Sequence, residues 1–189
     1  MTAHPDATPP ADDPAELAFQ RGLVLLYQQE DATGAEAAWI EADALGHAGA
    51  ATHLGLVAYH ERHDLDAAER AYARGAERGD GNGAFHLGLV RELRGDTDGA
   101  VAAFEQGDEL GHGGAAANLG VVLHERGNVE GAIGAFARAD GRGHGGGAFN
   151  LGVMLEARGD AEGARAAYGR ARARGEAGAD EALARLGGD

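Results

Sequence analysis

Several residue types are missing from this sequence of 189 residues or scarce in it: there is no cysteine and no lysine, and aromatic residues make up only 5%. Without cysteine, disulfides, thiolate metal sites and cysteine nucleophiles are excluded. All 16 basic residues are arginine, and 31 acidic residues leave a net charge of −15. Nucleic acids and anionic membranes are bound mainly through lysine and arginine. The composition therefore argues against both and favours basic or neutral partners.

Long hydrophobic runs are also missing. The longest clearly apolar stretch, residues 23–27, is far too short to span a bilayer. The first residues carry neither the positive start nor the apolar run of a signal peptide. We therefore expect a cytoplasmic protein.

Proline is confined to one end of the chain. All four prolines fall within the first 14 residues, among several aspartates. This composition predicts a flexible acidic tail over residues 1–13. It also predicts a helix that starts near Pro14, because the first turn of a helix tolerates the missing N–H of proline. The proline-free remainder suits an array of helices.

Glycine is abundant, with 33 residues, but it recurs at fixed intervals. One series, spaced by 32 or 33 residues, consists of Gly22, Gly55, Gly88, Gly120 and Gly152. An aromatic series with the same spacing consists of Trp39, Tyr72, Phe104, Phe136 and Tyr168. Two independent series with one period indicate a repeat array. We predict repeats near residues 15–47, 48–80, 81–112, 113–144 and 145–176.

Each repeat carries the pattern of two helices. Ala116, Leu119, Gly120 and Leu123 occupy one face of a helix. A Gly-Asn or Gly-Asp turn follows, in which glycine can adopt the left-handed conformation and the polar side chain can cap the next helix. Glycine inside a helix costs about 1 kcal/mol relative to alanine. We therefore expect the glycine series to permit close approach of the paired helix, whereas glycines outside it, such as Gly134, have no such evident role.

The motif Ala-x-x-Leu-Gly, then Gly-Asp/Asn, then Gly-Ala-x-x-Ala-Phe/Tyr resembles the tetratricopeptide repeat, and its Gly-His turns resemble Sel1-like repeats. Residues 148–152 followed by 163–168 show it, as do residues 84–88 followed by 99–104. The proline that closes the second helix in that family is absent, and each unit is one or two residues shorter. The resemblance covers residues 14–189 and implies an all-α fold: a right-handed α-solenoid of about five helix-turn-helix repeats. A final half unit predicts a capping helix over residues 180–187.

The resemblance also implies a binding surface. In several tetratricopeptide proteins, amide side chains two residues before the repeat glycine bind the main chain of an extended ligand. The residues at that position here are all polar: Gln20, His53, His86, Asn118 and Asn150. Such side chains both donate and accept hydrogen bonds, as recognition of a peptide main chain requires. The alternative is that they cap local backbone or face water.

Further positions lie one turn beyond the glycine and are expected to line the deeper groove. These are Tyr27, Tyr59, His60, Glu92, His124, Glu125 and Glu156. Their acidic and imidazole character favours a basic or neutral segment. Phe19, Phe85 and Phe149 either pack between repeats or form groove pockets, and packing is the favoured interpretation.

The nine histidines do not predict a metal site. His47, His112 and His144 recur in the turns between repeats, and a repeat step of about 10 Å keeps them too far apart to share zinc. Sensing of pH by His53 and His86 is the better-supported alternative. The sequence contains no phosphate loop and no catalytic triad or carboxylate pair above background. We expect neither a cofactor nor catalysis.

The leading hypothesis is a non-enzymatic protein-interaction scaffold that binds a peptide or protein segment in a concave groove. The alternative is a homo-oligomer formed by head-to-tail stacking. Residues 1–50 hold nine acidic residues and one arginine, whereas residues 158–175 hold five arginines and two acidic residues. Opposite charges at the two ends would favour such stacking, although the favoured interpretation is that these arginines form a solvated helix face.

Overall fold

The computed structural model describes residues 13–187, which form eleven helices and no strand. This confirms the all-α fold class. The helices are α1 (Pro14–Gln29), α2 (Ala32–Ala44), α3 (Ala48–His60), α4 (Leu65–Glu77), α5 (Gly81–Leu93), α6 (Thr97–Glu109), α7 (Gly113–Glu125), α8 (Val129–Gly141), α9 (Gly145–Ala157), α10 (Ala161–Ala173) and α11 (Ala179–Arg185). The predicted tail lies outside the described residues except for Asp13, which caps α1 by accepting a hydrogen bond from the Ala15 N–H.

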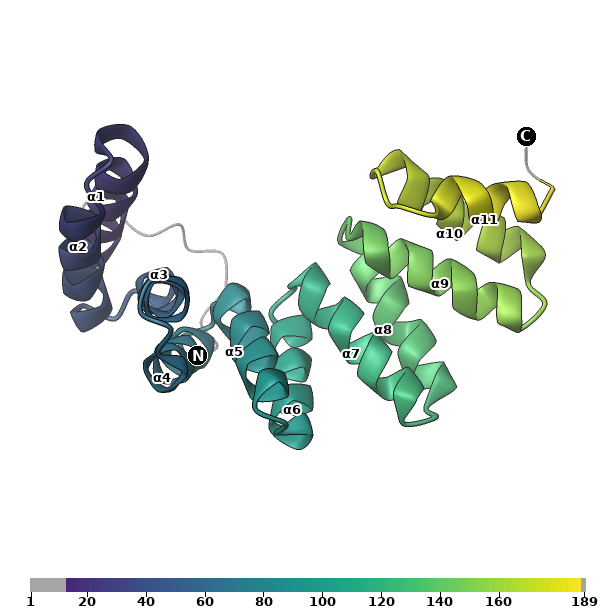
Figure 1. Cartoon of the computed structure of the whole chain (residues 1–189), viewed down its shortest axis with the longest axis horizontal. Coiled ribbons are helices and arrows are strands. Elements are labelled where there is room, and N and C mark those ends of the chain that lie inside the picture. The colour runs from purple at the N-terminus through teal and green to yellow at the C-terminus, as the bar shows by residue number, and fades with distance from the viewer. Residues whose placement is uncertain (1–12, 188–189) are drawn as a thin grey trace, which may run out of the picture. The chain divides into compact units, whose positions relative to one another are not determined.

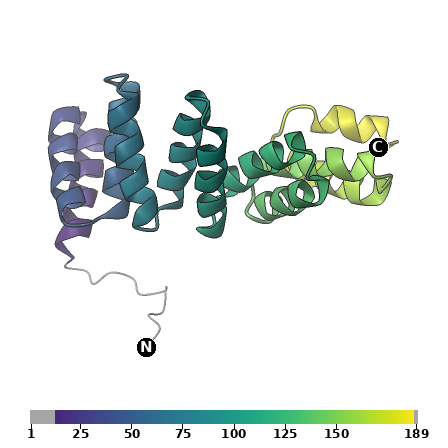
Figure 2. The same cartoon turned by 90° about the horizontal axis from the view of Figure 1, so that it is seen from below.

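The chain divides into two compact units, unit 1 (residues 1–83) and unit 2 (residues 84–189). In unit 1, α1 packs on α2, α2 on α3, and α3 on α4. In unit 2, each helix from α7 to α11 packs on the one before it in sequence, and α7 also contacts α9 (Figure 1). Figure 2 shows the paired helices of unit 1 lying side by side. Below, α1, α3, α5, α7 and α9 are called the first helices and α2, α4, α6, α8 and α10 the second helices.

The glycine series allows first and second helices to approach each other closely. A Cβ atom at Gly55 would lie 2.5 Å from ring carbons of Tyr72, and one at Gly120 would lie 2.6 Å from the Phe136 ring. The other three glycines of the series face the aromatic residue of their own repeat in the same way. Gly134 differs, because a Cβ atom there would meet only the end of the Arg138 side chain, at 3.5 Å. The packing role predicted for the series is therefore what the structure shows.

Glycine and a polar residue together form the turns inside the repeats. Gly127 adopts φ +76°, and Asn128 then accepts a hydrogen bond from the Gly131 N–H at 3.0 Å. Asp96 and Asp160 cap α6 and α10 in the same manner. Left-handed glycine followed by an N-cap residue ends one helix and starts the next, as the sequence predicts.

Histidine caps three of the first helices, α3, α7 and α9, which the sequence did not predict. The Nδ1 atoms of His47, His112 and His144 accept hydrogen bonds at 3.0–3.1 Å from the N–H groups of residues 50, 115 and 147. Only a neutral imidazole protonated on Nε2 can accept at Nδ1. The recurring Gly-His turn is thus a helix-capping device that replaces the usual aspartate or asparagine.

Ion pairs join successive second helices. Asp108 on α6 is 5% exposed and accepts hydrogen bonds from Arg138 Nε at 2.8 Å and from Arg142. Burial by itself raises the pKa of the Asp108 carboxyl, but the hydrogen bonds from the two arginines outweigh burial and hold that pKa below its ordinary value. Equivalent clusters, which we call arginine clamps, join Asp140 to Arg170 and Arg174 in unit 2, and Asp43 to Arg74 and Arg78 in unit 1.

The last repeat is covered by α11. Ala182 and Leu183 of this short helix are buried against Ala164 and Tyr168 of α10. Arg185 donates hydrogen bonds to the Glu156 carboxylate of α9 at 2.8 and 3.1 Å, so the helix is also held by charge. The apolar face that another repeat would otherwise cover is thereby removed from solvent.

Candidate functional site

In unit 2, the predicted ligand-binding position is occupied by His86 and by two amides. Asn118 lies on α7 and Asn150 on α9, and these first helices contact each other. Both side chains are half-buried, and neither has a hydrogen-bond partner among residues 13–187. Each amide therefore keeps two donors and an acceptor available to another molecule.

In unit 1, the equivalent side chains are engaged with their own helices. Gln20 donates from Nε2 to Glu16 at 2.7 Å. The Nδ1 of His53 lies 2.8 Å from the Gly49 carbonyl oxygen, and its ring packs against Phe19 and Trp39. Because a carbonyl only accepts, Nδ1 must carry the proton, which leaves Nε2 of the neutral ring as an acceptor.

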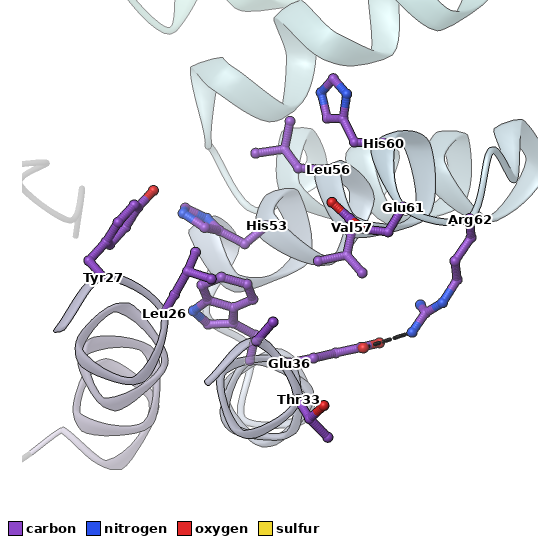
Figure 3. A pocket seen from close by; sticks show the side chains of 12 residues that line it. Leu26, Tyr27, Thr33, Glu36, His53, Leu56, Val57, His60, Glu61 and Arg62 are labelled. Atoms are coloured by element: carbon purple, nitrogen blue, oxygen red, sulfur yellow. Dashed lines mark hydrogen bonds and ion pairs between the residues drawn. The ribbon is translucent and has the colours of Figure 1, made fainter. Parts of the chain in front are cut away.

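A pocket of about 330 Å³ opens beside His53. It is bounded by the end of α1, the start of α2 and the outer face of α3 (Figure 3). Its lining residues are Leu26, Tyr27, Ala32, Thr33, Glu36, Trp39, His53, Leu56, Val57, His60, Glu61 and Arg62. The pocket thus brings together Tyr27, His53 and His60 from the predicted surface. Tyr59 does not line the pocket; its ring contacts the His60 ring edge-on, with the ring centroids 4.8 Å apart.

Two carboxylates and one guanidinium group border the pocket. Arg62 Nη2 donates to both carboxylate oxygens of Glu36, at 2.5 and 2.7 Å, which neutralises this pair (Figure 3). Glu61 is exposed and has no ion-pair partner among residues 13–187. The pocket therefore combines an apolar floor with one uncompensated negative charge.

The remaining predicted residues do not converge on a single pocket. His86 is half-buried, with its ring 5.2 Å from that of Phe85, while Glu92 and His124 are exposed. Phe85 also stacks on His112, and Phe19 stacks on His47 with ring centroids 4.2 Å apart. The phenylalanines therefore pack between repeats, as the favoured interpretation had it.

Glu156 has a structural role in the last repeat. Its carboxylate accepts hydrogen bonds from Arg185 and from the Tyr168 hydroxyl, the latter at 2.8 Å. The Arg185 and Tyr168 hydrogen bonds lower the pKa of Glu156. Burial, reinforced by the nearby Glu156 carboxylate, raises the pKa of Tyr168 to about 12.

Residues 13–187 contain no cluster of three or more histidine, aspartate or glutamate side chains arranged to hold a metal ion. The helices of the same part of the chain also lack the combination of length and apolar character that crossing a membrane requires. His47 instead links two helices, because its Nε2 lies 3.0 Å from a carboxylate oxygen of Glu16 on α1.

Sequence reasoning missed the pocket and the arginine clamps. The pocket depends on Trp39, whose indole nitrogen is buried without a hydrogen-bond partner, and on the Glu36–Arg62 pair between α2 and the end of α3. No local sequence motif predicts this arrangement. The clamps did have a signal, because Arg138 and Arg142 recur one repeat later as Arg170 and Arg174.

The fold of the chain is similar to that of known proteins, whereas no protein-family model and no curated protein sequence matches it. The solved structure of c5321, a protective antigen of uropathogenic Escherichia coli strains that displays an SLR fold, is similar with a TM-score of 0.81 and 20% identity. The match covers 93% of this chain but only 42% of c5321.

Two further solved structures are similar. A Sel1 repeat protein from Oxalobacter formigenes has a TM-score of 0.76 and 20% identity, over 92% of this chain and 79% of that protein. YrrB, described as a TPR protein with an unusual peptide-binding site, has a TM-score of 0.53 and 21% identity, over 87% of this chain and 88% of YrrB. The chain therefore has the fold of Sel1-like and tetratricopeptide repeat proteins, the group that its sequence pattern resembles.

Proposed function

We propose that this chain is a protein-interaction scaffold that binds an extended segment of another protein along the first helices α7 and α9 of unit 2. The observation that carries the proposal is the pair of half-buried amides, Asn118 and Asn150, neither of which has a hydrogen bond to any other residue of the described range 13–187. Amides that no other side chain or backbone group engages can exchange hydrogen bonds to water for hydrogen bonds to a ligand, and these two lie at equivalent positions of contacting helices. A peptide main chain offers both the N–H and the C=O groups that such amides bind.

The charge of the molecule supports a basic or neutral segment as the partner. With a net charge of −15, the surface repels acidic chains and attracts basic ones over a Debye length of about 8 Å at physiological salt. The likeness to YrrB, described as having a peptide-binding site, is compatible with this assignment. The proposal requires no catalytic step and no cofactor.

The test is a selection of peptides from a random library displayed on phage, followed by measurement of affinity by fluorescence polarisation. The variant is Asn118→Ala with Asn150→Ala, and the matched control is Gln28→Ala with Gln29→Ala, two exposed amides at the end of α1. Loss of two hydrogen bonds, each worth about 0.5–1.5 kcal/mol, predicts a loss of affinity of at least about fivefold in the variant only. Equal affinity of wild type and variant for every selected peptide would exclude the amides as the binding element.

Head-to-tail self-assembly receives less support from the arrangement of charges. The arginines of residues 158–174 already have partners: Arg158 pairs with Glu130, Arg165 donates to the Leu186 carbonyl, Arg170 and Arg174 clamp Asp140, and Arg172 lies 3.9 Å from Asp180. Four of these five arginines lie beside a carboxylate, so part of the positive charge that could attract an acidic end of another copy is already compensated. Light scattering at low and high salt tests this alternative, since electrostatic stacking predicts oligomers that dissociate as salt rises.

A further inference from the structure

The pocket of unit 1 has a charge balance that favours one class of side chain. Arg62 is the only arginine that lines the pocket. Its Nη2 donates to both carboxylate oxygens of Glu36, so the charge of Arg62 is compensated by that of Glu36. Glu61 remains as a carboxylate without a counter-ion among residues 13–187. An acidic occupant would therefore meet repulsion, whereas a basic occupant would supply the missing counter-charge.

The apolar part of the pocket suits an unbranched aliphatic stem. Leu26, Val57 and the largely buried Trp39 line it, and the ring of Tyr27, a residue that is 73% exposed, lies on the same side of the pocket as His53 (Figure 3). Lysine and arginine bury their methylene groups against such surfaces while the charged end stays in contact with water.

His53 adds a hydrogen-bond acceptor. Its Nδ1 is committed to the Gly49 carbonyl, so the neutral ring presents only the lone pair of Nε2 to a ligand. Nε2 has no partner among residues 13–187. An ammonium or guanidinium group is a pure donor and matches this acceptor, which a carboxylate or a carbonyl oxygen does not.

We propose that this pocket binds the basic side chain of a lysine or arginine on the partner polypeptide, with the stem on Leu26, Trp39 and Val57 and the cationic end at Glu61. This inference rests on the proposed function, because the partner segment supplies the side chain. It adds a specificity element in unit 1 to main-chain recognition by the amides of unit 2.

The test uses Trp39, which is the only tryptophan of the chain and therefore reports on this pocket through its intrinsic fluorescence. The probes are three acetylated, amidated pentapeptides, Ala-Ala-X-Ala-Ala, in which X is lysine, norleucine or glutamate. They are titrated at pH 8, where imidazoles are neutral. Norleucine retains the aliphatic stem of lysine and lacks its charge.

The lysine peptide is expected to change the Trp39 fluorescence saturably and to bind about two- to fivefold more tightly than the norleucine peptide, the range that an exposed ion pair provides. The glutamate peptide is expected to bind more weakly than norleucine. In Glu61→Gln, the preference for lysine over norleucine should fall about two- to fivefold. The control variant Glu77→Gln removes an exposed carboxylate of α4 and should keep the wild-type preference.

Equal binding of the lysine and norleucine peptides, an unchanged preference in Glu61→Gln, or no fluorescence change with any peptide would each overturn the proposal. The Asn118→Ala, Asn150→Ala variant separates it from the proposed function. If the selected peptides lose affinity in that variant while Glu61→Gln has no effect on lysine preference, main-chain binding stands and the basic pocket is wrong. If both variants behave as wild type, both proposals fail.

Discussion

Units 1 and 2 share one packing scheme and differ in the side chains that their first helices expose. In each unit, the glycines of the 32- to 33-residue series pack against aromatic rings. An arginine clamp around a buried or half-buried aspartate joins successive second helices. At the predicted ligand-binding position, however, unit 1 has His53, whose ring is held by its own backbone beside a pocket. Unit 2 has His86 and the amides Asn118 and Asn150, and neither amide has a hydrogen-bond partner among residues 13–187.

The difference indicates that the two kinds of position are under different physical constraints. A glycine of the series is required wherever a Cβ atom would overlap the aromatic side chain of the paired helix. The glycine therefore recurs in every repeat. The side chains at the predicted ligand-binding position are not subject to this packing constraint, so they can differ between the units. A common scaffold can therefore carry a side-chain pocket in one unit and main-chain recognition in the other.

The largest effect on stability is expected where the shared packing is broken. Gly55→Ala in unit 1 and Gly120→Ala in unit 2 should each lower the free energy of unfolding by about 1–3 kcal/mol, because the new methyl group enters an aromatic ring. Gly134→Ala, whose new methyl group meets only the end of the Arg138 side chain at an ordinary contact distance of 3.5 Å, should instead be neutral or raise it by up to about 1 kcal/mol. Chemical denaturation measures all three. If Gly55→Ala were harmless, the two units would not share this constraint.

The clamps provide the second way to compare the units. Asp108→Asn should lower the free energy of unfolding by about 1–2 kcal/mol, because charge-assisted hydrogen bonds to a buried carboxylate are lost. Asp43→Asn should have a similar but smaller effect, since the Asp43 side chain is more exposed. Asp98→Asn is the matched control: its side chain is 93% exposed in its ion pair with Arg126, so a change within about 0.5 kcal/mol is expected. Equal losses for Asp98→Asn and Asp108→Asn in urea titrations would show that burial of the clamp is irrelevant.

The same aspartates predict how stability depends on pH. The pKa values of Asp43, Asp108 and Asp140 are below their ordinary value in the folded chain, since arginine hydrogen bonds outweigh burial. A lowered folded-state pKa contributes stability above the unfolded value of about 3.9, and this contribution is lost as pH falls through the lower folded-state value. In thermal unfolding experiments between about pH 6 and 2.5, the melting temperature of the double variant Asp108→Asn, Asp140→Asn should therefore fall less steeply with decreasing pH than that of the wild type. Parallel pH profiles would contradict this.

The smallest effect concerns the histidine caps. His144→Ala removes the acceptor for the Gly147 N–H and should cost about 0.5–1 kcal/mol, whereas His144→Asp should retain the cap. His47 in unit 1 also contacts Glu16, so His47→Asp should lose that contact and place two carboxylates near each other. Thermal melts are expected to rank His144→Asp above His144→Ala, and the reverse order would rule out capping as the role of the imidazole.

The parts of the fold that follow from local periodicity were predictable from the sequence. The 32- to 33-residue glycine and aromatic series places Gly120 against Phe136, and the Gly-Asn turn predicts both the positive φ of Gly127 and the cap by Asn128. The pocket was not predictable, because it depends on the volume of Trp39 and on Arg62 reaching Glu36 across 26 residues. The histidine caps were visible as a pattern, but their Nδ1 acceptor role depends on ring orientation, which the spacing of His112 and His144 does not specify.

The most direct test of recognition by the first helices observes the two amides themselves. The side-chain NH₂ resonances of Asn118 and Asn150 can be followed by NMR, in the full chain, while a library-selected peptide is added. Our account predicts that both NH₂ groups shift and exchange more slowly with solvent at saturation, as hydrogen bonds to the peptide form. Saturated binding that leaves both groups unshifted and freely exchanging would contradict it.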